Sequence, residues 1–169
     1  MKSDATKFYS SKQEHMIANT LGWSVVSGSG AAAGHPGDIS SDDWMGECKT
    51  HTSPGKRIVF YADVWNKIRE EASSKFKYPV LFVDDGSQTK GNTWCLFEYL
   101  PVRPTYSEVL PYPYSVRTNI SFDSDKLRSY LRDYTRVEES KCILSVALNN
   151  KQLGICSLNT FANFFGEYI

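Results

Sequence analysis

Apolar side chains recur with a helical period in several segments of the chain. The clearest pattern covers residues 61–76, where Val64, Trp65 and Ile68 share one face and charged side chains occupy the other. An earlier helical pattern stops at Gly22, a residue type that commonly ends helices. The helices predicted in this way span about residues 11–21, 61–76, 124–135, with Ser124 as the N-cap, and 159–165.

Alternating or continuously apolar runs bounded by turn residues predict the strands. The run at 78–84 is apolar almost throughout, which is typical of a central strand buried on both faces. Asn149 and Asn150 predict a tight hairpin turn between two late strands. The predicted strands begin at Trp23 and then cover about residues 44–51, 78–84, 93–100, 115–122, 142–148 and 152–158.

The order of these elements predicts an α/β fold with a central mixed β-sheet flanked by helices. A chain of 169 residues is long enough for one well-packed domain and too short for two independent ones. We expect residues 1–100 to form the core and residues 101–169 to be an α+β extension that packs on this core or extends its sheet. Residues 101–116 contain four prolines and no consistent period, so we expect them to form a connecting arm.

The composition narrows the class of protein. Hydrophobic residues make up 41% and aromatic residues 14%, as in a globular chain. Nineteen basic and nineteen acidic residues cancel, so any contact with DNA must come from a local patch or a bound cation. The four cysteines lack the spacing of a zinc site, and we expect them to be free, buried and in a reducing compartment. No apolar run approaches the ~20 residues of a membrane span, so a cytoplasmic location without membrane contact is expected.

The segment GHPGDISSDDWMGECKTH, residues 34–51, places charged side chains where a strand pair is predicted. Side chains alternate along a strand, so Glu47 and Lys49 share one face and Cys48 points to the other. Asp38 lies across a tight turn and can reach Glu47 from the end of the adjacent strand. Two neighbouring carboxylates repel each other unless a cation lies between them, and Mg²⁺ commonly binds one or two carboxylates together with phosphate oxygens.

This arrangement has a simpler explanation and a chemical one. The simpler explanation is an exposed hairpin whose cross-strand charge pair contributes little. The chemical one is hydrolysis of a phosphodiester, which needs an activated water and positive charge where negative charge accumulates. A metal ion between the acids and the nearby Lys49 ammonium would supply both, and the order of elements around the segment favours this second explanation.

Asp38, Glu47 and Lys49 resemble the signature of the PD-(D/E)XK nuclease superfamily. Its members share a restriction-endonuclease-like α/β core with an acid on one strand, an acid-x-lysine on the next and often a glutamate on the preceding helix, which is Glu14 here. The segments SGSGAAAGHPGDI and GECKTH are most similar to archaeal and phage Holliday junction resolvases. One departure is that a glycine separates the proline from the aspartate.

The resemblance implies a Mg²⁺ ion, replaceable by Mn²⁺, held by Asp38, Glu47 and the backbone carbonyl of Cys48. Glu14 would be an outer or second-metal ligand, and Lys49 the catalytic base or charge stabiliser. The implied activity is that of a DNA endonuclease, here a homodimeric resolvase of branched DNA in a prokaryotic or phage-infected cell. The alternatives are a restriction-like or repair nuclease for linear duplex DNA, a nuclease for RNA, and a non-catalytic DNA-binding protein with the same fold.

Five polar residues near the motif are candidate DNA contacts. Each also has an ordinary explanation, as a loop residue that satisfies local backbone or as part of a solvated surface. Backbone N–H groups in a glycine-rich loop suit an anion, and strand alternation places a histidine on the face of the lysine. The residues are Ser27, Ser29, His51, Lys56 and Arg57.

Overall fold

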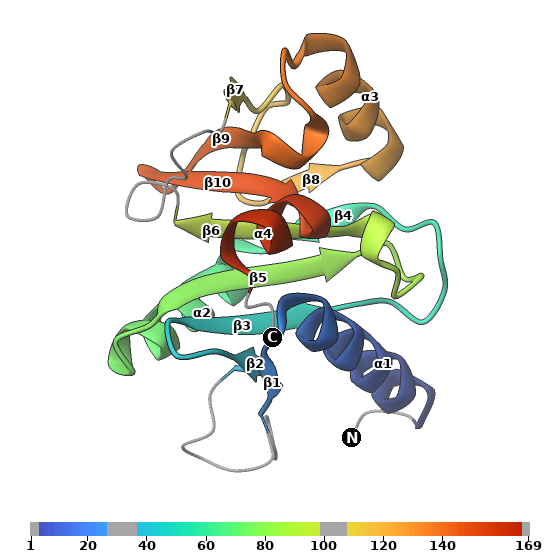
Figure 1. The fold of residues 1–169 in the computed structure, drawn as a ribbon, viewed down its shortest axis with the longest axis vertical. Helices are drawn as coiled ribbons and strands as arrows, with labels where there is room; N and C mark the ends of the chain where they lie inside the picture. The colour runs from blue at the N-terminus through green and yellow to red at the C-terminus, as the bar shows by residue number, and fades with distance from the viewer. Residues whose placement is uncertain (1–3, 27–36, 99–107, 167–169) are drawn as a thin grey trace.

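The computed structural model describes residues 4–26, 37–98 and 108–166, and within them a mixed sheet is flanked by helices (Figure 1). The predicted α/β class is therefore confirmed. In the described part of the chain the sheet has eight strands in the order β1-β2-β3-β5-β6-β10-β9-β7. In that order they span Ser24–Val25, Ile39–Ser40, Trp44–Lys49, Tyr78–Asp84, Thr93–Glu98, Lys151–Ser157, Cys142–Leu148 and Glu108–Pro111.

Helices cover both faces of this sheet. Figure 1 shows α1 and α4 in front of the sheet and α2 behind it. β4 and β8 form a short two-stranded sheet on the α2 side. This sheet and the helix α3 pack against the same core as α2. The elements are α1 (Asp4–Leu21), α2 (Ala62–Ser74), α3 (Ser124–Tyr134), α4 (Leu158–Phe165), β4 (Ile58–Phe60), β8 (Ile120–Phe122), and the 3₁₀ turns η1 (Lys90–Asn92) and η2 (Glu139–Lys141).

The central strand β5 divides the apolar residues into two cores. Its side chains alternate, so Leu81 and Val83 enter the core beneath α2, while Val80 and Phe82 enter the core beneath α1 and α4. These four side chains are at most 3% exposed, as the continuous apolar run predicts. β3 runs parallel to β5 and β6 runs antiparallel to it, which makes the sheet mixed.

Residues from the last third of the chain extend the sheet. β10 pairs antiparallel with β6, and Cys156 lies opposite Cys95 in that register. The turn between β9 and β10 places Asn149 and Asn150 at φ of 50° and 63°, which confirms the predicted hairpin turn. All four cysteines are free and buried, as expected.

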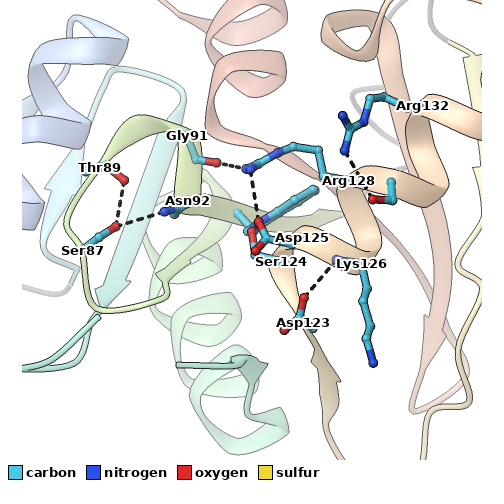
Figure 2. Close-up of polar contacts among 12 residues, drawn as sticks. Ser87, Thr89, Gly91, Asn92, Asp123, Ser124, Asp125, Lys126, Arg128 and Arg132 are labelled. Atoms are coloured by element: carbon cyan, nitrogen blue, oxygen red, sulfur yellow. Dashed lines mark hydrogen bonds and ion pairs between the residues drawn. The ribbon is translucent and has the colours of Figure 1, made fainter. Parts of the chain in front are cut away.

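Polar contacts attach α3 to the turn before β6 (Figure 2). The Arg128 guanidinium donates a hydrogen bond to the carbonyl oxygen of Gly91 and lies 5.8 Å from the ring centre of Trp94. The Trp94 indole N–H donates to Ser124 Oγ at 2.8 Å, and both groups are buried. The C-terminal third is therefore joined to the first hundred residues by side-chain contacts as well as by strand pairing.

The predicted element boundaries were wrong in several places. α1 begins at Asp4, well before the expected start near residue 11, because its first turns are mostly exposed and lack an apolar stripe. The N-cap of α3 is Asp123, whose side chain accepts a hydrogen bond from the Lys126 amide, and Ser124 is the first helical residue. The expected connecting arm contains β7, which pairs parallel with β9, and the short strand β4 was not expected.

Phe76, just after α2, has a backbone conformation that is unfavourable for its side chain. Its φ is 57° and its side chain is 99% exposed, so little packing offsets the cost of the left-handed conformation. We expect Phe76→Gly to raise the free energy of unfolding by about 1 kcal/mol, measured by urea denaturation. Phe76→Ala is the matched control, because it removes the same ring without relieving the backbone; an equal gain in both variants would contradict the explanation.

Candidate active site

Asp38 is fixed between β1 and the end of β3. Its carbonyl oxygen accepts a hydrogen bond from the Val26 amide, and its own amide donates to the carbonyl oxygen of Gly46, both at 2.8 Å. Its carboxylate Oδ2 accepts a 2.8 Å hydrogen bond from the Cys48 amide. β2 pairs with β3 at Met45 and Gly46. The Asp38 side chain therefore extends the contact with β3 as far as Cys48.

Glu47 and Lys49 form an ion pair on the face of β3 that also carries Met45. Lys49 Nζ lies 2.9 Å from Glu47 Oε1, and the Glu47 side chain is 13% exposed while that of Lys49 is 47% exposed. Met45 belongs to the core beneath α2, so by strand alternation the pair lies on the α2 side of the sheet. The structure therefore confirms the prediction that Glu47 and Lys49 share one face of β3.

The charges of Asp38 and Glu47 interact. Burial raises the pKa of Glu47, the negative charge of Asp38 raises it further, and Lys49 and Lys67 act in the opposite direction. Burial by itself lowers the pKa of Lys49, but the charge and hydrogen bond of Glu47 and the charge of Asp38 outweigh it and leave that pKa raised. The structure thus brings the three motif residues into one electrostatic cluster, in which the charge of Asp38 opposes ionisation of Glu47.

Cys48 is buried on the opposite face, in the core beneath α1 and α4. Burial raises the pKa of its thiol well above the usual value, with further contributions from Asp38, Glu14 and Glu47. Glu14, on α1, is therefore near enough to act electrostatically at this strand end. In a strand the N–H and C=O of one residue point to the same edge. The Cys48 carbonyl accordingly points to the same edge of β3 as the Cys48 N–H, which donates to Asp38.

These groups fit a hard divalent cation in their chemistry. The predicted donors are two carboxylates and a backbone carbonyl, and a cation would offset the burial and the Asp38 charge that raise the pKa of Glu47. Across residues 4–26, 37–98 and 108–166, no three or more Asp, Glu, His or Cys side chains are arranged to hold a metal ion. The metal roles of Asp38, Glu47, the Cys48 carbonyl and Glu14 therefore stay predictions.

The other predicted contact residues are only partly placed. His51, Lys56 and Arg57 are exposed and lie on the segment between β3 and β4, directly after the motif. The Arg57 guanidinium donates a 3.1 Å hydrogen bond to Ser121 Oγ on β8. Ser27 and Ser29 lie outside the described residues.

A hollow of about 860 Å³ lies away from this cluster. Tyr78, which lines it, pairs with Trp44 at the start of β3, whereas Lys49 pairs with Val83 at the other end of the same two strands. Its rim carries basic and acidic side chains together, so its charge does not select an anion. The lining residues are Arg69, Glu70, Ser73, Ser74, Phe76, Lys77, Tyr78, Pro79 and Glu98.

Comparison of this chain with protein-family models, with curated proteins and with solved structures gives no match. No helix in the described ranges has the length and apolar character needed to cross a membrane.

Two buried polar residues at this strand end were not predicted from the sequence. Gln13 on α1 donates from Nε2 to the carbonyl oxygen of Lys49 at 2.6 Å. It lies four residues before Ile17 and eight before Leu21, on the same completely buried stripe. A glutamine within an apolar helical stripe was the signal that could have identified it.

The second is Asp84, at the end of β5. Its Oδ1 accepts hydrogen bonds from Thr50 Oγ1 at 2.5 Å and from the Gly86 amide at 2.9 Å. Gln88 Nε2 donates to Thr50 Oγ1 at 2.8 Å and to the carbonyl oxygen of His51 at 3.0 Å. This group holds the segment that follows Lys49 against the turn after β5.

The charge of Asp84 is expected to reduce stability at neutral pH. Asp84 is completely buried, its Oδ2 has no hydrogen-bond partner among the described residues, and burial raises its pKa. A carboxyl whose folded pKa is raised destabilises the fold at pH values above that pKa, and the penalty disappears as the pH falls toward its unfolded pKa. Asp84→Asn keeps an acceptor for Thr50 and Gly86 while it removes the charge.

We therefore expect Asp84→Asn to raise the free energy of unfolding by about 1 kcal/mol at pH 7.5, and by less at pH 4.5. Urea denaturation at the two pH values measures this difference. Asp85→Asn, on the partly exposed neighbour, is the matched control and should show a smaller change at either pH. A loss of stability of equal size at both pH values in Asp84→Asn would show that the hydrogen bonds matter and the charge does not.

Proposed function

We propose that this chain is a metal-dependent nuclease that hydrolyses phosphodiester bonds in DNA, with a restriction-endonuclease-like core. The observation that carries the proposal is the cluster of Asp38, Glu47 and Lys49 at one end of β3. Here burial and then the charge of Asp38 raise the pKa of Glu47, and the Lys49 ammonium lies 2.9 Å from Glu47. The order of elements supports it as well, because a helix with Glu14 precedes the strand pair, and α2 and the parallel strand β5 follow.

The side chains divide the work of the proposed reaction. Asp38, Glu47 and the carbonyl of Cys48 would hold Mg²⁺, with Mn²⁺ as a substitute. The bound ion would supply positive charge at the scissile phosphate and lower the pKa of a nearby water. The Asp38 carboxylate also accepts a hydrogen bond from the Cys48 amide, which keeps the end of β3 in register.

Lys49 fits the role of a charge stabiliser better than that of a base. Its Nζ lies 2.9 Å from Glu47 Oε1, an ion pair that favours the ammonium form, and an ammonium has no lone pair to accept a proton. Its partly exposed position leaves it accessible to a phosphate. There it would offset the negative charge that develops as the nucleophile attacks.

The substrate within this class follows from the resemblance to Holliday junction resolvases. A resolvase makes two symmetric cuts, which implies a homodimer with two copies of the site. His51, Lys56 and Arg57 continue the chain from the site and would meet the DNA backbone next to the scissile bond. Basic side chains that pair with phosphates give DNA binding that weakens as the salt concentration rises.

Cleavage assays test the proposal. Labelled Holliday junction, flap, single-stranded and linear duplex DNA, with RNA of the same sequence, are incubated with Mg²⁺, Mn²⁺ or a chelator. We expect metal-dependent cutting of DNA, with the junction preferred. Preference for linear duplex would retain the nuclease and reject the resolvase. An absence of Mn²⁺ or Mg²⁺ binding that depends on Asp38, measured by calorimetry, would favour a non-catalytic DNA-binding protein, and cutting that survives the chelator would refute the metal site.

A further inference from the structure

Gln13 reaches the strand end that carries the candidate site from α1. Its Nε2 donates a 2.6 Å hydrogen bond to the carbonyl oxygen of Lys49. Because a carbonyl oxygen can only accept, this contact fixes which end of the amide faces Lys49. The side chain is completely buried, and its Oε1 has no hydrogen-bond partner in the described residues.

Net stability does not select a glutamine at this position. Its Nε2 satisfies the Lys49 carbonyl oxygen, but its Oε1 is left as an unpaired buried acceptor, and these two effects on stability have opposite signs and similar size. A methionine would continue the apolar stripe of Ile17 and Leu21 and would remove both effects. What the glutamine adds is a hydrogen bond that ties α1 to the last peptide of β3.

Lys49 is a residue whose direction needs such a restraint. β3 ends at Lys49, and its side chain is 47% exposed, so packing on its own does not fix where the ammonium points. The bond from Gln13 limits rotation of the last peptide of the strand, and with it the direction of the Lys49 side chain. The next residue is held from the other side, where Thr50 Oγ1 donates to Asp84 Oδ1.

We propose that Gln13 is a positioning residue that holds the Lys49 peptide so that the Lys49 ammonium stays beside Glu47. The inference rests on the proposed nuclease function and adds to it a residue that touches neither substrate nor metal. Displacement of a catalytic group by ~1 Å can lower the reaction rate about a hundredfold, so we expect the effect of losing Gln13 in kcat. Asp38 keeps its hydrogen bond from the Cys48 amide, which does not involve Gln13.

The test is Gln13→Met, which keeps the length of the side chain and removes the donor. We expect kcat on the preferred DNA substrate to fall roughly 10- to 100-fold. KM and the thermal midpoint should stay close to wild type. Thr20→Val is the matched control, because it removes a 2.8 Å hydrogen bond to the Met16 carbonyl on the same helix and should leave kcat unchanged.

A second measurement needs neither metal nor substrate. In the metal-free protein, Gln13→Met should shift the NMR resonances of the Lys49 carbonyl carbon and the Thr50 amide, because the hydrogen bond to this peptide is lost. Thr20→Val should leave both resonances in place. Unchanged resonances in Gln13→Met would overturn the proposed restraint on the strand end.

The kinetic outcomes separate this inference from the proposed function. Wild-type kcat in Gln13→Met, or a fall in kcat matched by an equal loss of thermal stability, overturns the positioning role. If Gln13→Met does not fold, Gln13→Leu is judged by the same criteria, and failure of both to fold shows a structural role and overturns it too. A wild-type chain that cuts no nucleic acid rejects the nuclease proposal itself, whereas cutting that depends on Asp38 but not on Gln13 rejects only the present inference.

Discussion

Asp38→Asn is expected to lower metal-dependent DNA cleavage by about 10²- to 10⁴-fold while the protein stays folded. The amide can still accept the hydrogen bond from the Cys48 amide, so the register at the end of β3 is kept. What is lost is the negative charge that would bind the cation, and electrostatic stabilisation by a metal is worth several kcal/mol, or a few powers of ten in rate. The measurement is single-turnover cleavage with Mg²⁺, together with a thermal melt of the same sample.

Two controls make this experiment specific. Asp42→Asn removes an exposed acid from the turn between β2 and β3 and should leave cleavage within about twofold. Asp38→Ala removes the hydrogen bond as well as the charge, and should lower the free energy of unfolding by about a further 1 kcal/mol relative to Asp38→Asn. Full cleavage in Asp38→Asn would remove Asp38 from the site, and the metal-dependent mechanism with it.

The parts of the fold that the sequence predicted are those dominated by local pattern. β5 was found because its two faces are both apolar, and the turn at Asn149 and Asn150 because asparagine tolerates positive φ. β7 and β4 were missed because short strands at or near a sheet edge owe their pairing to distant partners, β9 and β8. No local period reports such a pairing.

In the candidate site, too, the features set by local pattern were predicted and those set by long-range contacts were not. The faces taken by Glu47, Cys48 and Lys49 follow from strand alternation and were predicted. The hydrogen bond between Gln13 and Lys49 joins residues 36 positions apart, and that between Thr50 and Asp84 joins residues 34 apart. Which polar side chains support a strand end is decided by how the helix and the neighbouring strand pack, and this information is not present in the motif.

The C-terminal helix α4 contributes to the core on which this strand is built. Phe161 is completely buried, and its ring lies edge-on to those of Trp44 on β3, at 5.1 Å between ring centres, and Phe82 on β5, at 5.6 Å. It also contacts Trp23, beyond the end of α1. Residues predicted as an extension therefore complete the packing of the strand that carries the site.

We expect Phe161→Ala to lower the free energy of unfolding by about 3–5 kcal/mol, because it removes a large buried ring and leaves a cavity among aromatic neighbours. Urea denaturation followed by tryptophan fluorescence measures this loss, since Trp23 and Trp44 report from the cavity wall. Phe164→Ala is the matched control on the same helix; its ring is only partly buried, and a loss of about 1 kcal/mol is expected.

The shape of the Phe161→Ala transition carries further information. Because α4 packs against residues from α1, β3 and β5, the first hundred residues and the last third should unfold together in one transition in both the wild type and the variant. Equal losses from Phe161→Ala and Phe164→Ala would show that α4 contributes general apolar contact and no specific packing. A separate early transition in Phe161→Ala would show that the C-terminal third unfolds by itself, and β3 would then keep its site without it.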